Sequence, residues 1–182
     1  MTDKKPELSA TMKNKLEPKV FKKNPIIGTK FTIAISSAKG GVGKSTFASN
    51  IALALKKIGF KVGLLDADIY GPSIPKMLGV YEKPTASKIN KMLPYEKFSI
   101  KAMSIGNMIP DDQAIIWRGA MASRAIKQLL NDVEWGNLDF LIIDLPPGTG
   151  DIQLSLCQTL MITGAVIVST PQEVSILDVR KA

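Results

Sequence analysis

Short apolar runs alternate along the chain with longer stretches in which apolar residues recur at helical spacing. Runs rich in β-branched and aromatic residues predict buried strands at 31–35, 61–65, 138–143 and 165–169, and a looser alternation predicts another strand at 98–105. Most of these runs are bounded by glycine, proline or aspartate, as strands in folded domains usually are. The pattern therefore predicts five strands.

Helical spacing of apolar residues appears between these strands. It predicts helices at 45–58, 121–133 and 151–161, a short helix at 75–78 within a lysine-rich surface excursion, and a first helical turn at 170–173. Strands that alternate with helices in this way predict an α/β fold. We expect a doubly wound, mostly parallel sheet with helices on both faces.

A glycine-rich segment joins the first predicted strand to the first predicted helix. Three glycines, at 40, 41 and 43, let the backbone turn so closely that successive N–H groups converge on one point, which suits a phosphate. Lys44 adds a mobile positive charge for the β- and γ-phosphates, and the Ser45 hydroxyl is placed to ligate Mg²⁺. The spacing is that of a P-loop; an ordinary glycine-rich connection would not require Lys44 and Ser45 at these positions.

Carboxylates end two of the predicted strands. Because ligands bind at the carboxyl ends of strands in open α/β sheets, Asp66, Asp68 and Asp144 are expected beside the phosphate-binding loop. Asp68 is the candidate for orienting the attacking water, and Asp66 for a supporting role toward Mg²⁺. Asp144 follows a hydrophobic strand in the Walker B arrangement, which holds Mg²⁺. The alternative for Asp66 and Asp68 is a polar turn that caps a strand.

Two prolines and a glycine follow Asp144. The prolines stiffen the backbone, and Gly148 allows an N–H to approach the γ-phosphate, so the segment could report whether that phosphate is present. A proline-rich turn without a switching role is the alternative. Arg118, just ahead of a predicted helix, is a candidate for contact with phosphate or with a neighbouring subunit, and an ordinary surface arginine is the alternative.

Composition narrows the chemistry. The 182 residues contain no histidine and one cysteine, which excludes imidazole catalysis and a Cys-x-x-Cys metal site within one chain. Cys157, on an apolar helix, is interpreted as a packing residue. No apolar run is long enough to span a bilayer and no secretory signal is evident, so the cytoplasm is the expected location.

Positive charge is concentrated at the N-terminus. Residues 1–30 hold eight lysines and three acids, which is +5 of the total net charge of +8. We expect residues 1–25 to form a flexible basic tail and residues 26–182 to form one domain. A solvated tail is favoured over a nucleic-acid or lipid-binding arm, because the tail has no arginine and one aromatic residue.

The motifs together resemble a known family. Ala38 stands where the first glycine of a P-loop usually falls, and Lys39 follows it, which resembles the deviant P-loop of the MinD/ParA/Mrp branch of ATPases. With the other motifs, the chain resembles the Mrp/ApbC family, whose members are P-loop ATPases implicated as iron-sulfur cluster carriers, with the mitochondrial Ind-type proteins as relatives. The motifs that carry the resemblance lie at 39–46, 66–77, 117–119, 144–151 and 169–172.

The resemblance implies roles for single residues. Lys39, Lys44 and Asp68 would be catalytic, with Lys39 reaching the nucleotide of a partner subunit in a homodimer. Ser45, Asp66 and Asp144 would hold Mg²⁺, with Asp144 in switch II. The residues implied in ATP binding are Lys39, Gly40, Gly41, Val42, Gly43, Lys44, Ser45, Thr46 and Gly148.

The family's function is implied in the same way. It would be Mg-dependent ATP hydrolysis by in-line attack of water, coupled to the carriage of an iron-sulfur cluster to apo-proteins, without a nucleic-acid or membrane partner. The mitochondrial matrix is the alternative to the cytoplasm. Family members hold the cluster with a C-terminal Cys-x-x-Cys, which is absent from this chain, so we expect a C-terminally incomplete domain. A MinD/ParA-type positioning ATPase and a non-catalytic truncated remnant are the alternative functions.

Overall fold

The computed structural model describes residues 23–108, 119–148 and 150–180. Its centre is a six-stranded sheet with strand order β3-β4-β2-β5-β1-β6. The sheet is parallel except for β3, which pairs antiparallel with β4 at one edge. The strands are β1 (Thr29–Ser36), β2 (Val62–Asp66), β3 (Tyr95–Lys97), β4 (Ile100–Ser104), β5 (Leu138–Asp144) and β6 (Gly164–Ile167).

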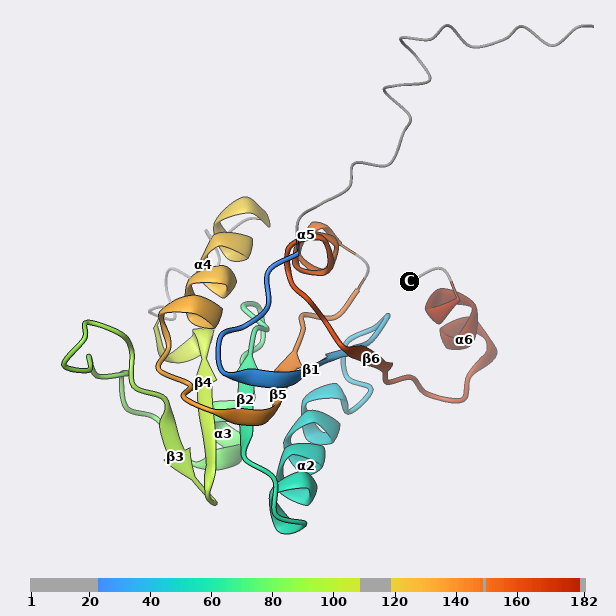
Figure 1. Cartoon of the computed structure of the whole chain (residues 1–182). Helices are drawn as coiled ribbons and strands as arrows, with labels where there is room; N and C mark the ends of the chain where they lie inside the picture. Colours follow the sequence, from blue (N-terminus) through green and yellow to red (C-terminus); the bar gives the residue numbers. More distant parts are fainter. Residues whose placement is uncertain (1–22, 109–118, 149, 181–182) are drawn as a thin grey trace, which may run out of the picture.

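Helices cover both faces of this sheet (Figure 1). Two of them, α2 and α3, pack on one face, while α4 and α5 pack on the other. The helices are α2 (Lys44–Lys57), α3 (Ile74–Leu78), α4 (Gly119–Asp132), α5 (Asp151–Thr159) and α6 (Glu173–Val179), with a 3₁₀ turn at Ile105–Asn107. The predicted doubly wound α/β fold is confirmed.

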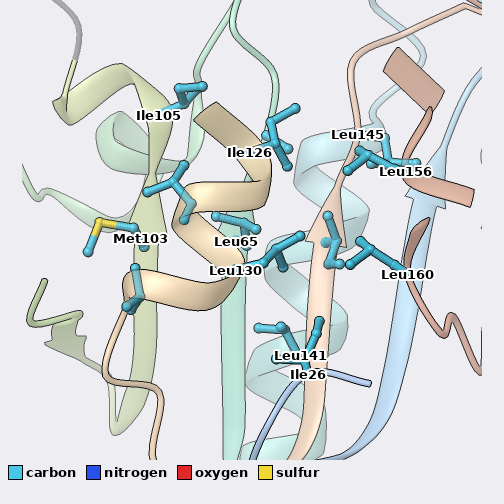
Figure 2. Packing of buried hydrophobic residues seen from close by; sticks show 14 of the residues in the cluster. Ile26, Leu65, Met103, Ile105, Ile126, Leu130, Leu141, Leu145, Leu156 and Leu160 are labelled. Carbon is cyan, nitrogen blue, oxygen red and sulfur yellow. The ribbon is translucent and has the colours of Figure 1, made fainter. Parts of the chain in front are cut away.

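Two hydrophobic clusters result from the alternation of side chains along the strands. Leu65 and Leu141 point toward α4 and α5, whereas their neighbours Leu64 and Ile142 point toward α2 and α3. Figure 2 shows the first cluster, in which Leu65 and Leu141 of the sheet lie against helical side chains such as Leu130. Burial on both faces explains why the central strands are apolar throughout.

The hairpin at the sheet edge differs from the prediction. A single strand over 98–105 was expected, but β4 begins at Ile100 and residues 95–97 form β3. Phe98 and Ser99 make the tight turn between them, with φ of 50° and 59°. The sequence does not indicate this turn, because residues with such angles are usually glycine or asparagine and neither is present here.

Four further observations bear on the predictions. The prediction that Cys157 packs in the core is wrong, because the residue is exposed: its neighbour Leu156 takes the buried side of α5. The last helix extends to Val179, well beyond one turn. Of the expected tail, residues 1–22 lie outside the described part, and Asn24 forms a parallel bridge with Leu160. Among the described helices none is long and apolar enough to cross a membrane.

Candidate functional site

The predicted P-loop connects the carboxyl end of β1 to the first residue of α2. Gly41 and Gly43 adopt left-handed backbone angles, with φ of 78° and 90°, which residues with a Cβ rarely adopt. Gly43 is the N-cap of α2, so the positive end of the helix dipole faces the loop. Beside the loop lies a cavity of about 520 Å³. Free N–H groups at a helix N-terminus are a favourable environment for a phosphate.

Residues from three strand ends surround this cavity. The loop and the start of α2 contribute Gly40, Gly41 and residues 43–46. The segment after β2 contributes Asp68 and Gly71, and the segment after β5 contributes Pro147. Lys39, Val42 and Gly148 belong to the same segments but do not line the cavity, and neither do Asp66 and Asp144, the last residues of β2 and β5. The structure thus brings together most of the residues that the sequence predicts.

Lys44 is the electrostatic centre of the site. Its Nζ donates a hydrogen bond to Oδ1 of Asp144 at 2.7 Å and lies 3.5 Å from Oδ2 of Asp68. It also lies 3.4 Å from the hydroxyl of Ser45. All three charged side chains are buried. One buried cation is therefore shared between two buried carboxylates.

This arrangement perturbs the titration of two carboxyl groups. Burial raises the pKa of Asp144, an effect that Lys44 opposes by favouring the charged form. Burial also raises the pKa of Asp66, to about 7, with a further contribution from the nearby Asp144. Carboxylates with perturbed pKa values beside a cavity are typical of functional sites, and structural networks produce them too.

Asp66 has a different environment from the one the sequence suggested. Its Oδ1 accepts a hydrogen bond from the backbone N–H of Asp68, at 3.1 Å. Its Oδ2 accepts two more, from the N–H of Ile74 and the hydroxyl of Ser104, both at 3.1 Å. Asp66 thereby ties β2 to the first residue of α3 and to β4. Its role toward Mg²⁺ stays a prediction, and Ser104 is a member of the site that sequence reasoning missed.

The oxygen atoms of Asp144 and Ser45 are suitable ligands for a Mg²⁺ ion. Oδ2 of Asp144 is buried and has no hydrogen-bond partner among the described residues. The Ser45 hydroxyl interacts with the same carboxylate. Oxygen ligands of this kind, one carboxylate and one hydroxyl, are those that Mg²⁺ takes next to bound phosphates. The unused oxygen of Asp144 is the observation that supports the fit.

The segment after β5 is fastened to the start of the P-loop. The N–H of Gly148, whose φ is 100°, donates to the carbonyl oxygen of Ser37 at 2.7 Å. The Ser37 hydroxyl in turn donates to the carbonyl oxygen of Lys39 at 2.8 Å. A contact between this N–H and a γ-phosphate, which the sequence suggested, would require the N–H to leave Ser37. The Gly148 N–H could therefore bond either to Ser37 or to a γ-phosphate, but not to both at once.

Lys39 lies at the rim of the site. Its Nζ forms an ion pair with Oδ2 of Asp178 on α6, at 3.2 Å, and both side chains are substantially exposed. No sequence pattern points to Asp178, because α6 lies far along the chain from Lys39 and follows a different strand. The expected contact of Lys39 with a partner's nucleotide stays a prediction. Arg118 lies outside the described residues.

Comparisons with known proteins find similar sequences over most of the chain. A family model described as ParA, NUBPL iron-transfer P-loop NTPase, matches residues 28–182. An "iron-sulfur cluster carrier protein" of Aquifex aeolicus is 52% identical over 165 residues, which are 90% of this chain and 45% of that protein. An "iron-sulfur cluster transfer protein NUBPL" of Dictyostelium discoideum is 54% identical over 156 residues, which are 85% of this chain and 48% of that protein.

A solved structure shows the same fold. A nucleotide-binding protein from Archaeoglobus fulgidus, in complex with ADP, superposes with a TM-score of 0.72 and 41% identity. The match covers 85% of this chain and 61% of that one. The chain thus spans about half the length of the curated relatives that it matches.

Proposed function

Because the chain belongs to the ParA/NUBPL family of iron-transfer P-loop NTPases, we propose that it is the nucleotide-binding part of an ATP-hydrolysing iron-sulfur cluster carrier. The observation that carries the proposal is the position of Lys44. This buried cation rises from the P-loop between Asp68 and Asp144 and lines a cavity large enough for a nucleotide's phosphates. Membership of the iron-transfer family favours the function of a cluster carrier over that of a MinD/ParA-type positioning ATPase.

ATP binding would place the phosphates against the loop. The N–H groups between Gly40 and Thr46 are the proposed donors to the β-phosphate, and the Lys44 ammonium would turn from the two carboxylates toward the β- and γ-phosphates. This exchange replaces one set of anionic partners of Lys44 by another, so the cation stays paired throughout. The similar Archaeoglobus fulgidus protein was solved in complex with ADP, which supports nucleotide binding by this chain.

Hydrolysis would then be an in-line displacement on the γ-phosphorus. A water oxygen forms a bond to phosphorus while the bond to the β,γ-bridging oxygen breaks, which releases ADP and inorganic phosphate. Asp68 lines the cavity and is the proposed group that orients this water. Its Oδ1 accepts the N–H of Gly71 at 3.2 Å, which fixes the carboxylate's direction. Most of the catalysis would come from positioning and electrostatic stabilisation.

Ser45 and Asp144 are the proposed ligands of Mg²⁺. When bound, this ion neutralises charge on the β- and γ-phosphate oxygens. Once Lys44 turns toward phosphate, Asp144 loses its cation, and a buried carboxylate needs another positive partner. The same residue thus serves Lys44 in one arrangement and the metal in the other.

The cluster-carrying function is proposed from the relatives. The Aquifex aeolicus and Dictyostelium discoideum proteins are named for iron-sulfur carriage and transfer, and this chain aligns with about half of each. Its one cysteine lies on α5, so we propose that cluster ligands belong to the part of longer family members that this chain does not span. Homodimerisation, with iron-sulfur apo-proteins as partners, is proposed with it. The cytoplasm is the proposed location and the mitochondrial matrix the alternative.

Turnover of ATP tests the proposed catalysis. Phosphate release from Mg-ATP should be slowed strongly by Asp68→Asn, which keeps the shape of the side chain but not its charge, while nucleotide binding persists. Lys57→Ala is the matched control, since Lys57 is an exposed residue at the opposite end of the same helix that carries Lys44. Equal turnover in Asp68→Asn and the parent would refute the role of Asp68, and no turnover in the parent would favour the non-catalytic remnant.

A further inference from the structure

A second cavity lies at the opposite edge of the sheet from the P-loop. Its volume is about 490 Å³, and its walls include Val62, Ile100 and Leu138, which are the first residues of β2, β4 and β5. The P-loop follows the last residue of β1, at the carboxyl edge of the same parallel sheet. A ligand at this second cavity would therefore not compete with nucleotide.

Lysines dominate the walls of the second cavity. Lys56, Lys61 and Lys101 line it together with a single carboxylate, Glu96. The ammonium of Lys101 donates to the carbonyl oxygen of Trp135 at 2.9 Å, which holds that charge in place. Lysines at the C-terminus of α2 also complement the helix dipole, but Lys61 and Lys101 lie outside that helix. The local charge is thus clearly positive.

Two exposed aromatic residues, Phe60 and Phe98, directly precede residues that line the cavity, Lys61 and Ser99. Phe60, the residue before Lys61, packs edge-on against Phe140, with ring centroids 5.0 Å apart. Phe31 stacks on the same Phe140 ring, with centroids 5.2 Å apart, and both Phe31 and Phe60 remain more than one third exposed. Phe98, at the tip of the hairpin, is 60% exposed. We call this lysine-lined cavity with its flanking phenylalanines the amino-edge surface.

We propose that the amino-edge surface binds an acidic protein segment that carries an aromatic or aliphatic side chain. Charge complementarity argues for this partner: its carboxylates would meet the three lysines, and its apolar side chain would cover Phe31 and Phe60. An aromatic anchor within a polar rim is the usual composition of a protein docking site. The proposal does not depend on ATP hydrolysis, because the two sites lie at opposite edges.

The same surface is less suited to other polyanions. Glu96 lines the cavity, and Asp139, the residue before Phe140, forms an ion pair with Lys30 at 2.8 Å. Such interspersed carboxylates repel the uniform charge of nucleic acid or an anionic bilayer, whereas a protein segment of mixed sequence can avoid them. No arginine is among the residues that line the cavity, so bidentate phosphate contacts are not available there. A concave site also favours a side chain over a flat membrane.

Fluorescence anisotropy with a defined peptide tests the proposal. The probe is a fluorescein-labelled glutamate-rich peptide with a central Phe-Phe pair, and its partner peptide has Ser-Ser in that place. The double substitution Lys56→Glu with Lys61→Glu should weaken binding of the Phe-Phe peptide about tenfold or more, since two attractions become repulsions. Lys83→Glu with Lys88→Glu, the same charge change at exposed positions of the excursion after α3, should leave it unchanged.

The other outcomes overturn the proposal. They are absence of binding to the parent, equal losses in the two double variants, and equal affinity for the Ser-Ser peptide. Tighter binding of single-stranded DNA or of phosphatidylserine vesicles would assign the surface to another class of partner. Self-association of the parent that Lys56→Glu with Lys61→Glu abolishes would assign it to a second copy of the chain. Saturating Mg-ATP should leave the peptide affinity unchanged. Loss of nucleotide binding and loss of peptide binding are therefore separate results that can be told apart.

Discussion

Replacing Lys44 should destabilise the protein strongly in the absence of nucleotide. The Lys44 ammonium lies 2.7 Å from Asp144, and the two side chains are 6% and 0% exposed. At that distance the gross attraction is roughly 6 kcal/mol for an effective dielectric constant of about 20. Desolvation of both charges offsets much of it, yet removing one partner of a buried pair typically costs roughly 3–5 kcal/mol, because the other charge stays buried and unpaired.

Lys44→Met is the informative substitution, because methionine fills most of the space of the lysine stem. We expect the free energy of unfolding in urea to fall by roughly 3–5 kcal/mol near neutral pH, which corresponds to about 6–20 °C in Tm. The loss should shrink as the pH falls and Asp144 takes up a proton, since burial already raises the pKa of that carboxyl. Lys57→Met, on the exposed end of α2, is the control and should change little.

A double-mutant cycle decides whether the ion pair causes the loss. Asp144→Asn removes the charge that Lys44→Met leaves unpaired, so the double variant should be more stable than the sum of the single effects predicts, by about 2 kcal/mol or more. Additivity within about 0.5 kcal/mol would refute the reasoning. It would mean that Lys44 and Asp144 do not share an energetically coupled pair.

The remaining predictions concern residues around this centre. Burial raises the pKa of Asp66 to about 7 from its ordinary 3.8, so the folded protein holds a proton that the unfolded chain releases. Stability in urea should therefore decline as the pH rises through that interval, and Asp66→Asn should flatten the decline; an unchanged slope contradicts this. Asp178→Asn breaks an exposed pair with Lys39 and should change the unfolding free energy by less than about 1 kcal/mol; a larger loss would show a buried role. Gly106→Ala places a Cβ 2.6 Å from Pro72 and should cost roughly 1–3 kcal/mol in the same assay, whereas a neutral effect would show that the Pro72 loop yields freely.

The sequence predicts those parts of the site whose residues lie within short continuous motifs. The P-loop, Asp68 and Asp144 follow apolar strands directly, and the parallel sheet brings the ends of these strands together. The residues that contact one another within the site are, however, far apart in the sequence. Lys44 and Asp144 are 100 positions apart, and Ser104 is 38 positions from Asp66, so no local pattern announces either pair.

Departures in the fold have local causes. The hairpin between β3 and β4 has no sequence signature, because Phe98 and Ser99 adopt backbone angles that are typical of glycine or asparagine. The apolar character of α5 predicts that Cys157 is buried, but Leu156 of α5 and Leu160, which follows the helix, take the buried positions. Apolar spacing predicts that a helix packs, and the neighbouring strands decide which of its residues are covered.

Calorimetric titration with Mg-ATP tests the central claim most directly. The claim is that Lys44 exchanges Asp144 and Asp68 for the phosphates of a nucleotide in the P-loop cavity. The account predicts saturable one-site binding to the parent and to Lys57→Met, and loss of binding in Lys44→Met at a urea concentration and temperature where circular dichroism shows that variant to be folded. Binding of Mg-ATP to folded Lys44→Met with the affinity of the parent would contradict the account.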